Sequence, residues 1–126
     1  LSIGRGTMNP FELVGHPDLK SFEFTFTPVG INGMAKHPLL ENQLCHGLDL
    51  RQAPVSGRID LSYLIKLYQA FPDKDKFFIS YFDKLAGTDE LRKMIRAGKT
   101  EEEIHASWQA DLDQFKKIRA KYLIYP

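Results

Sequence analysis

The sequence predicts an α+β fold, in which a small mixed sheet from the N-terminal half is covered by helices of the C-terminal half. Polar and apolar residues alternate in the segment FEFTFTPV (residues 22–29), and from Asp60 onward apolar residues recur at helical spacing. No Ser/Gly linker or internal repeat separates the halves, although Gly and Pro are frequent only up to about Gly57. We therefore expect one domain over residues 1–126.

Three segments of the first half are candidate strands. The phenylalanines of residues 22–29 point to one side and the polar residues to the other, which is typical of a half-buried strand. The segment CHGLDLRQ (45–52) repeats this alternation through its leucines, and LSIGRG (1–6) is a weaker candidate. Residues 30–44 are expected to form a loop with a short helical turn.

Helix signals begin at Asp60, which we expect to cap a helix that Pro72 ends. The segment FFISYFDKLAG (77–87) fits a strand or a buried helix equally well. Thr88 is expected to cap the next helix and Gly98 to end it.

The last helix has the clearest start, because Thr100 and Glu103 form a T-x-x-E capping box. Acidic residues occupy its first turn and basic residues its last turns, which suits the helix dipole. We expect its apolar stripe to be core, although aromatic side chains could also stack on a sugar. The stripe consists of Ile104, Trp108, Leu112, Phe115 and Tyr122. Asp111 and Asp113 are expected on its solvated face.

Charge and composition exclude several classes of function. Seventeen Lys and Arg against sixteen Asp and Glu give a net charge of +1, and the basic residues are spread over both halves. This argues against a nucleic-acid or membrane-surface binder. No apolar run approaches the ~20 residues that a membrane span needs, and no signal peptide is recognisable. Because the chain opens on Leu-Ser-Ile-Gly, we expect it to be a piece of a longer protein that carries any export signal.

Catalytic and metal-binding patterns are weak. Cys45 and His46 could be a nucleophile and its base, but neighbouring strand residues point to opposite faces, so we expect a buried structural cysteine. A metal site formed by His37, Cys45 and His46 would need a further ligand, and these residues lack the usual spacing of metal ligands. No two isolated carboxylates suggest acid–base work. A single cysteine permits no internal disulfide.

Arg5 is the most unusual residue, because Gly4 and Gly6 flank it. Glycines allow a ligand or another chain to approach the backbone, while the guanidinium offers a planar fork of donors to a carboxylate or phosphate. Alternatively, the glycines serve a bulge or tight turn and Arg5 pairs with an internal acid. The residues alone favour neither interpretation.

Several segments together resemble the C-terminal domain of the DUF1343 family, the NamZ-type exo-β-N-acetylmuramidases of peptidoglycan recycling. They are GRGTMNPFELVGHPDL, FTFTP, HGLDLR and the long tail FDKLAGTDELRKMIRAGKTEEEIHASWQADLDQFKKIRAKYLIY. The resemblance covers nearly the whole chain and departs from the family pattern at residues 30–44.

The resemblance implies a two-domain bacterial hydrolase. An N-terminal Rossmann-like domain would hold the catalytic acid, and the substrate cleft would lie where the two domains meet. Such enzymes remove terminal N-acetylmuramic acid from muropeptides without a cofactor. This chain would be the cleft-forming C-terminal domain, inactive alone, in a periplasmic or secreted protein.

A muramidase cleft needs a cation or backbone donors for the lactyl carboxylate of its substrate. We expect Arg5, with Gly6 and Thr7, to bind that group, and Lys36, His37 and His46 to be secondary candidates. The chain itself would contribute no catalytic residue and no metal ligand. Two alternatives are a noncatalytic glycan-binding module and a scaffold that docks on the N-terminal domain through an apolar surface rimmed by residues 4–11.

Overall fold

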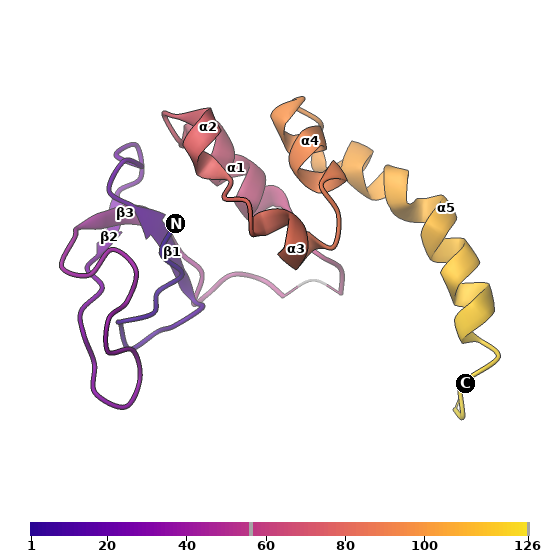
Figure 1. Ribbon diagram of the computed structural model, residues 1–126, viewed down its shortest axis with the longest axis horizontal. Coiled ribbons are helices and arrows are strands. Elements are labelled where there is room, and N and C mark those ends of the chain that lie inside the picture. Colours follow the sequence, from indigo (N-terminus) through magenta and orange to yellow (C-terminus); the bar gives the residue numbers. More distant parts are fainter. Residues whose placement is uncertain (56, 126) are drawn as a thin grey trace. The chain divides into compact units, whose positions relative to one another are not determined.

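A computed structural model describes residues 1–55 and 57–125. In chain order its elements are β1 (Leu13–His16), β2 (Phe24–Phe26), β3 (Cys45–Asp49), α1 (Ser62–Ala70), α2 (Lys74–Phe77), α3 (Phe82–Ala86), α4 (Glu90–Arg96) and α5 (Glu101–Arg119) (Figure 1). They form two compact units, unit 1 (Leu1–Phe78) and unit 2 (Ile79–Pro126). The predicted α+β class is confirmed. The expectation of one domain over residues 1–126 stays a prediction.

The sheet of unit 1 is antiparallel, with strand order β1-β3-β2, rather than mixed. Gly15 of β1 faces Gly47 of β3 in register, and a Cβ atom on Gly47 would overlap the carbonyl oxygen of Val14. The strands therefore approach closely because both facing residues lack a side chain. Both strands predicted at residues 22–29 and 45–52 are present in shortened form.

The third strand was predicted in the wrong place. Residues 1–6 form only an isolated bridge between Ser2 and Gly15, while Leu13–His16 forms β1. Gly4 and Gly6 have φ angles of 77° and 85°, which turn the backbone out of the extended conformation. The segment after Ser2 is therefore a looped connection that leads into β1.

One face of the sheet packs against α1 and α2. A cluster of buried side chains fills this layer, with Val14 and Leu48 from the strands packed against it. Its buried members are Leu19, Leu67, Phe71 and Phe77. The His16 and Phe71 rings form a T-shaped pair with a centroid distance of 5.0 Å. This apolar layer fixes the sheet and both helices as one body.

The other face of the sheet holds a smaller cluster of Leu13, Phe26 and Cys45. Cys45 is fully buried, as predicted, and burial raises the pKa of its thiol. The neighbouring His46 is only half-buried, and its Nδ1–H donates to the Phe22 carbonyl oxygen at 3.2 Å. The two side chains thus have separate structural partners, and no nucleophile–base pair forms.

The predicted helix boundaries of unit 1 agree closely with the structure. The Asp60 carboxylate accepts a 2.9 Å hydrogen bond from the Ser62 N–H where α1 begins. The helix ends at Ala70, and Phe71, with ψ of 127°, adopts the extended conformation that a following proline imposes. The ambiguous segment 77–87 contains the end of α2 and all of α3, so it is helical where it is regular.

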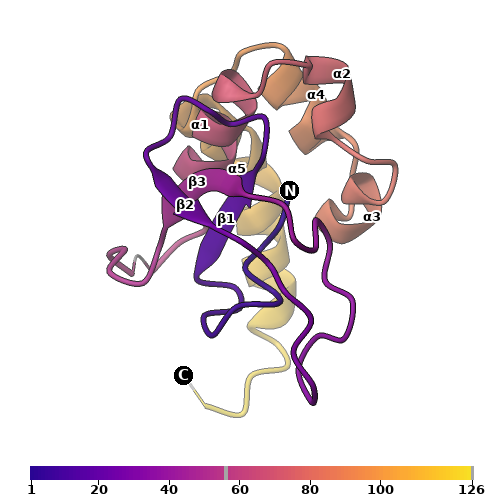
Figure 2. The same ribbon diagram turned by 90° about the vertical axis from the view of Figure 1, so that its left-hand side faces the viewer.

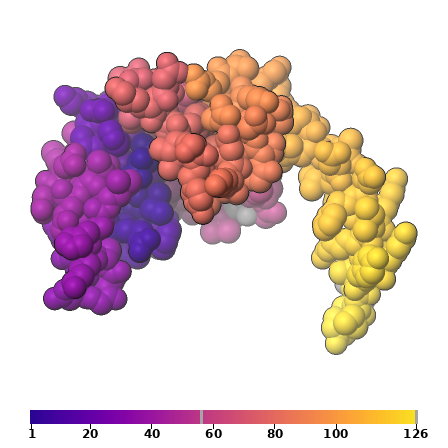
Figure 3. Space-filling view, in the orientation of Figure 1, coloured from indigo at the N-terminus to yellow at the C-terminus, as the bar shows by residue number. Residues whose placement is uncertain are grey.

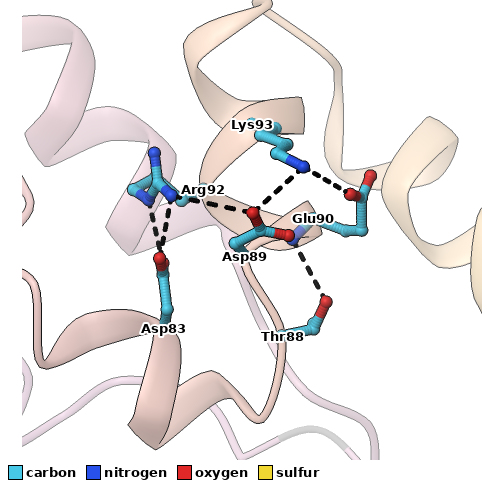
Figure 4. A network of polar contacts seen from close by, with 6 residues as sticks. All are labelled: Asp83, Thr88, Asp89, Glu90, Arg92 and Lys93. Carbon is cyan, nitrogen blue, oxygen red and sulfur yellow. Dashed lines mark hydrogen bonds and ion pairs between the residues drawn. The ribbon is translucent and has the colours of Figure 1, made fainter.

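In unit 2, α3 and α4 are joined by paired hydrogen bonds. The Arg92 guanidinium donates to both carboxylate oxygens of Asp83 at 2.8 Å, which lowers the pKa of that carboxyl (Figure 4). Thr88 accepts from the Glu90 N–H at 3.2 Å, but the N-cap of α4 is Asp89, one residue after the predicted Thr88. Gly98, with φ of 75°, follows the C-cap as predicted.

The capping box of α5 is confirmed in both directions. Thr100 accepts from the Glu103 N–H, and Glu103 accepts from the Thr100 N–H. The predicted core stripe is wrong beyond its start, since Ile104 is fully buried but Leu112, Phe115 and Tyr122 are exposed. In Figure 3 the second half of α5 extends past α3 and α4, which agrees with the exposure of its apolar side chains. None of the described helices is both long and apolar enough to span a bilayer.

Candidate binding pocket around Arg5

Two long loops of unit 1 enclose a pocket beside the sheet. One loop precedes β1, the other connects β2 to β3, and both extend from the same end of the sheet (Figure 2). The pocket has a volume of about 370 Å³. Its lining consists of Arg5, Gly6, Pro10, Phe11, Met34 and Ala35.

Gly6 holds the two loops together. Its carbonyl oxygen accepts a 2.8 Å hydrogen bond from the Val29 N–H, and Pro38 packs against it. A Cβ atom at position 6 would lie 2.5 Å from Pro38 Cγ and 2.8 Å from the Val29 oxygen. Only glycine tolerates this approach together with a φ of 85°.

Thr7 stabilises the turn that presents Arg5. Its hydroxyl donates to the Gly4 carbonyl oxygen at 2.7 Å and accepts from the Asn9 N–H at 3.1 Å. The only hydroxyl hydrogen is therefore used inside the loop. Thr7 acts on the pocket through the backbone and has no proton left to donate to a ligand in this conformation.

The Arg5 side chain is exposed and makes no hydrogen bond or ion pair with another described residue. Other charged groups of unit 1 do have partners. Arg51 forks onto Asp49 with an Nη2–Oδ2 distance of 2.6 Å, and its hydrogen bonds lower the pKa of Asp49 to about 2. Lys76 lies 2.9 Å from Asp73. Among the described residues no acidic side chain pairs with Arg5, so the alternative interpretation of an internal ion pair is not observed.

The pocket combines one cation with apolar walls. Phe11 and Met34 supply exposed apolar surface, and Arg5 is the one charged group among the described lining residues. Such a lining suits an organic ligand with a single carboxylate or phosphate. No carboxylate, imidazole or thiol occurs among these lining residues, so acid–base catalysis here would need groups from elsewhere.

The secondary candidates have different positions. Lys36 is exposed, follows the lining residue Ala35, and forms no ion pair within the described part of the chain. His37 is exposed, and its Nδ1 lies 3.4 Å from Glu41 Oε2. His46 is held on the sheet by Phe22, away from the lining. Lys36 is thus adjacent in sequence to the lining of the Arg5 pocket without being part of it, and His46 is not part of it either.

Sequence reasoning did not identify the apolar lining residues. Phe11 has a φ of 67°, which is rare for a residue with a side chain, and 70% of its surface is exposed. Met34 belongs to residues 30–44, which were predicted as a loop with a short helical turn and depart from the family pattern. Its neighbour Gly33, with φ of 79°, makes the turn that returns Ala35 to a backbone bridge with Ile31. Gly33 was the local sequence signal for the turn that positions this part of the lining.

Comparisons with known proteins identify the class of this domain. The family model described as "Exo-beta-N-acetylmuramidase NamZ, C-terminal" matches residues 1–125. The chain therefore belongs to the NamZ C-terminal domain family.

Two relatives agree with this assignment. The chain is 35% identical to the peptidoglycan β-N-acetylmuramidase NamZ of Bacillus subtilis (strain 168) over 147 aligned positions, which cover 99% of this chain and 34% of that protein. It also matches the crystal structure of a DUF1343 family protein from Bacteroides fragilis NCTC 9343, with a TM-score of 0.88 and 43% identity, over 98% of this chain and 36% of the other. The chain thus spans about a third of the length of these relatives.

Proposed function

We propose that this domain forms part of the substrate cleft of an exo-acting glycoside hydrolase that releases terminal N-acetylmuramic acid from peptidoglycan fragments. The proposal is supported by the family and by the name of the B. subtilis relative. The catalytic groups would belong to an N-terminal Rossmann-like domain of the same protein, and the isolated domain would be inactive. The host protein would be periplasmic or secreted.

The unpaired guanidinium beside an apolar pocket carries the proposal. N-acetylmuramic acid differs from N-acetylglucosamine by a lactyl ether, which adds a methyl group and a carboxylate. The planar fork of Arg5 matches a carboxylate, while Phe11 and Met34 offer apolar surface to the methyl group and the sugar ring. A charge-assisted hydrogen bond of this kind contributes about 1.5–3 kcal/mol.

The other predicted site residues have supporting roles in this proposal. Gly6 and Thr7 hold the loop that presents Arg5, through their contacts with Val29, Gly4 and Asn9. Lys36, which follows the lining residue Ala35, adds a second positive charge to this loop. His37 and His46 stay predictions, since neither lines the pocket.

A second candidate function is a scaffold that docks on the N-terminal domain without touching substrate. The exposed apolar side chains of Ile3, Met8 and Phe11 favour it, because they rim the same loop. Under this alternative Arg5 would contact the neighbouring domain, and its loss would change stability rather than substrate binding.

The kinetics of Arg5→Ala in the full-length protein test the proposal. We expect KM for a chromogenic N-acetylmuramide to rise about tenfold or more while kcat stays within about twofold, because Arg5 binds ground state and transition state alike. Lys20→Ala is the matched control, since Lys20 is an exposed cation outside the pocket lining. Unchanged kinetics of Arg5→Ala with a lowered unfolding temperature would favour the scaffold.

A further inference from the structure

The second half of α5 carries an uncovered apolar surface. Leu112, Phe115 and Ile118 of α5, together with Tyr122 three residues past its end, form what we call the α5 stripe. Their exposed fractions are 45%, 59%, 48% and 79%. Because intervals of three residues place side chains on one side of a helix, the three helical members form a continuous surface about 9 Å long.

The same helix is packed at its other end. Ile104 is fully buried and Trp108 half-buried, so burial falls along α5 toward its C-terminus. A contiguous row of large apolar side chains is uncommon on a free surface and marks an interaction site. The row continues past the end of the helix with Tyr122 and then Leu123, which is 46% exposed.

Positive charge borders the α5 stripe. Lys116 and Arg119 lie beside its helical residues, and Lys116 Nζ lies 3.8 Å from the carboxylate of Asp113. A complementary surface would therefore be apolar at its centre and acidic at its rim. Such a surface belongs to folded protein rather than to a sugar, which offers one ring face to an aromatic side chain.

The family match indicates where this surface belongs. The matching family model extends through residue 125, so the α5 stripe lies inside the domain that the family shares. That model describes the C-terminal part of its proteins, and about two thirds of each compared relative lies outside the matched region. The relatives thus provide a large partner within their own chain.

We propose that the α5 stripe packs against the part of the full-length protein that precedes residue 1, on an apolar surface with an acidic rim. α5 then fastens this domain to its neighbour through residues other than those that line the Arg5 pocket. The inference shares the N-terminal partner with the proposed function but does not depend on what the pocket binds.

Photo-cross-linking in the full-length protein tests the inference. Phe115→p-benzoyl-phenylalanine keeps an aromatic side chain, and irradiation is expected to give an intramolecular cross-link to a peptide from before residue 1, identified by mass spectrometry. Lys117→p-benzoyl-phenylalanine is the control, because position 117 lies about 200° around the helix from 115. We expect its cross-linking yield to that region to be at least fivefold lower.

Three outcomes would overturn the inference. They are cross-links from position 115 only to peptides within residues 1–126, cross-linked dimers that show a second copy on the stripe, and equal yields at positions 115 and 117. Tyr122→p-benzoyl-phenylalanine provides a second probe if the first variant fails to fold. The muramidase kinetics are measured on the same preparations, so a failed cross-link with normal hydrolysis separates this inference from the proposed function.

Discussion

Gly6 shows how one residue determines whether the pocket can form. Its missing side chain lets the loop before β1 meet Pro38 and Val29, and its positive φ turns the chain so that Arg5 stays exposed. The cation and its support thus come from adjacent residues. The function proposed for the Arg5 guanidinium therefore depends on the backbone contact between Gly6 and Val29.

Gly6→Ala is expected to destabilise unit 1 by about 3 kcal/mol, because the new Cβ atom meets backbone and a proline ring in addition to the left-handed strain. Gly33→Ala is the matched control. Gly33 has a similar φ of 79° but nothing within 4 Å of the Cβ position, so only the strain of about 1 kcal/mol remains. Denaturant unfolding of both variants gives the difference, and equal losses would refute the steric account.

At the scale of elements, the termini of α4 and α5 were predictable because their signals are local. Thr88, Gly98, Thr100 and Glu103 satisfy backbone groups within four residues of themselves. The β1 strand was missed because its pairing with β3 joins residues far apart in sequence. Short-range alternation identified β2 and β3 but not the four residues LVGH of β1, in which Gly15 faces Gly47 and breaks any alternation of large side chains.

Thr100→Ala is expected to destabilise unit 2 by about 1 kcal/mol, since the Glu103 N–H loses its acceptor. Thr100→Ser keeps the hydroxyl and should stay within about 0.5 kcal/mol of the wild type. Thermal unfolding followed by circular dichroism measures both. If serine and alanine cost the same, the capping box does not stabilise α5.

The α5 stripe shows where helical periodicity misleads. The spacing predicted an apolar face correctly, yet the assumption that such a face is core fails at Leu112, Phe115 and Tyr122. Periodicity indicates that a surface is to be covered but does not identify what covers it. The pocket shows a similar limit. The Gly-Arg-Gly pattern indicated Arg5, but Phe11 and Met34 line the pocket through loop contacts that leave no periodic signal in the sequence.

At the scale of the whole molecule, the domain has two surfaces with different chemistry. Unit 1 presents a pocket with one cation and apolar walls, and unit 2 presents the α5 stripe with its basic border. We propose that the pocket binds substrate and that the stripe binds the neighbouring part of the protein. Hydrolysis needs groups that the described pocket residues do not supply.

The central claim is that Arg5 recognises the lactyl carboxylate, and a binding cycle tests it most directly. Calorimetry would compare N-acetylmuramic acid with its neutral lactyl amide on full-length wild type and on Arg5→Ala. Either change alone, Arg5→Ala in the protein or the amide in the ligand, is expected to raise Kd about tenfold. The two changes together are expected to raise Kd no further, because both remove the same contact. Losses that simply multiply would mean that Arg5 and the carboxylate do not interact, and would contradict the claim.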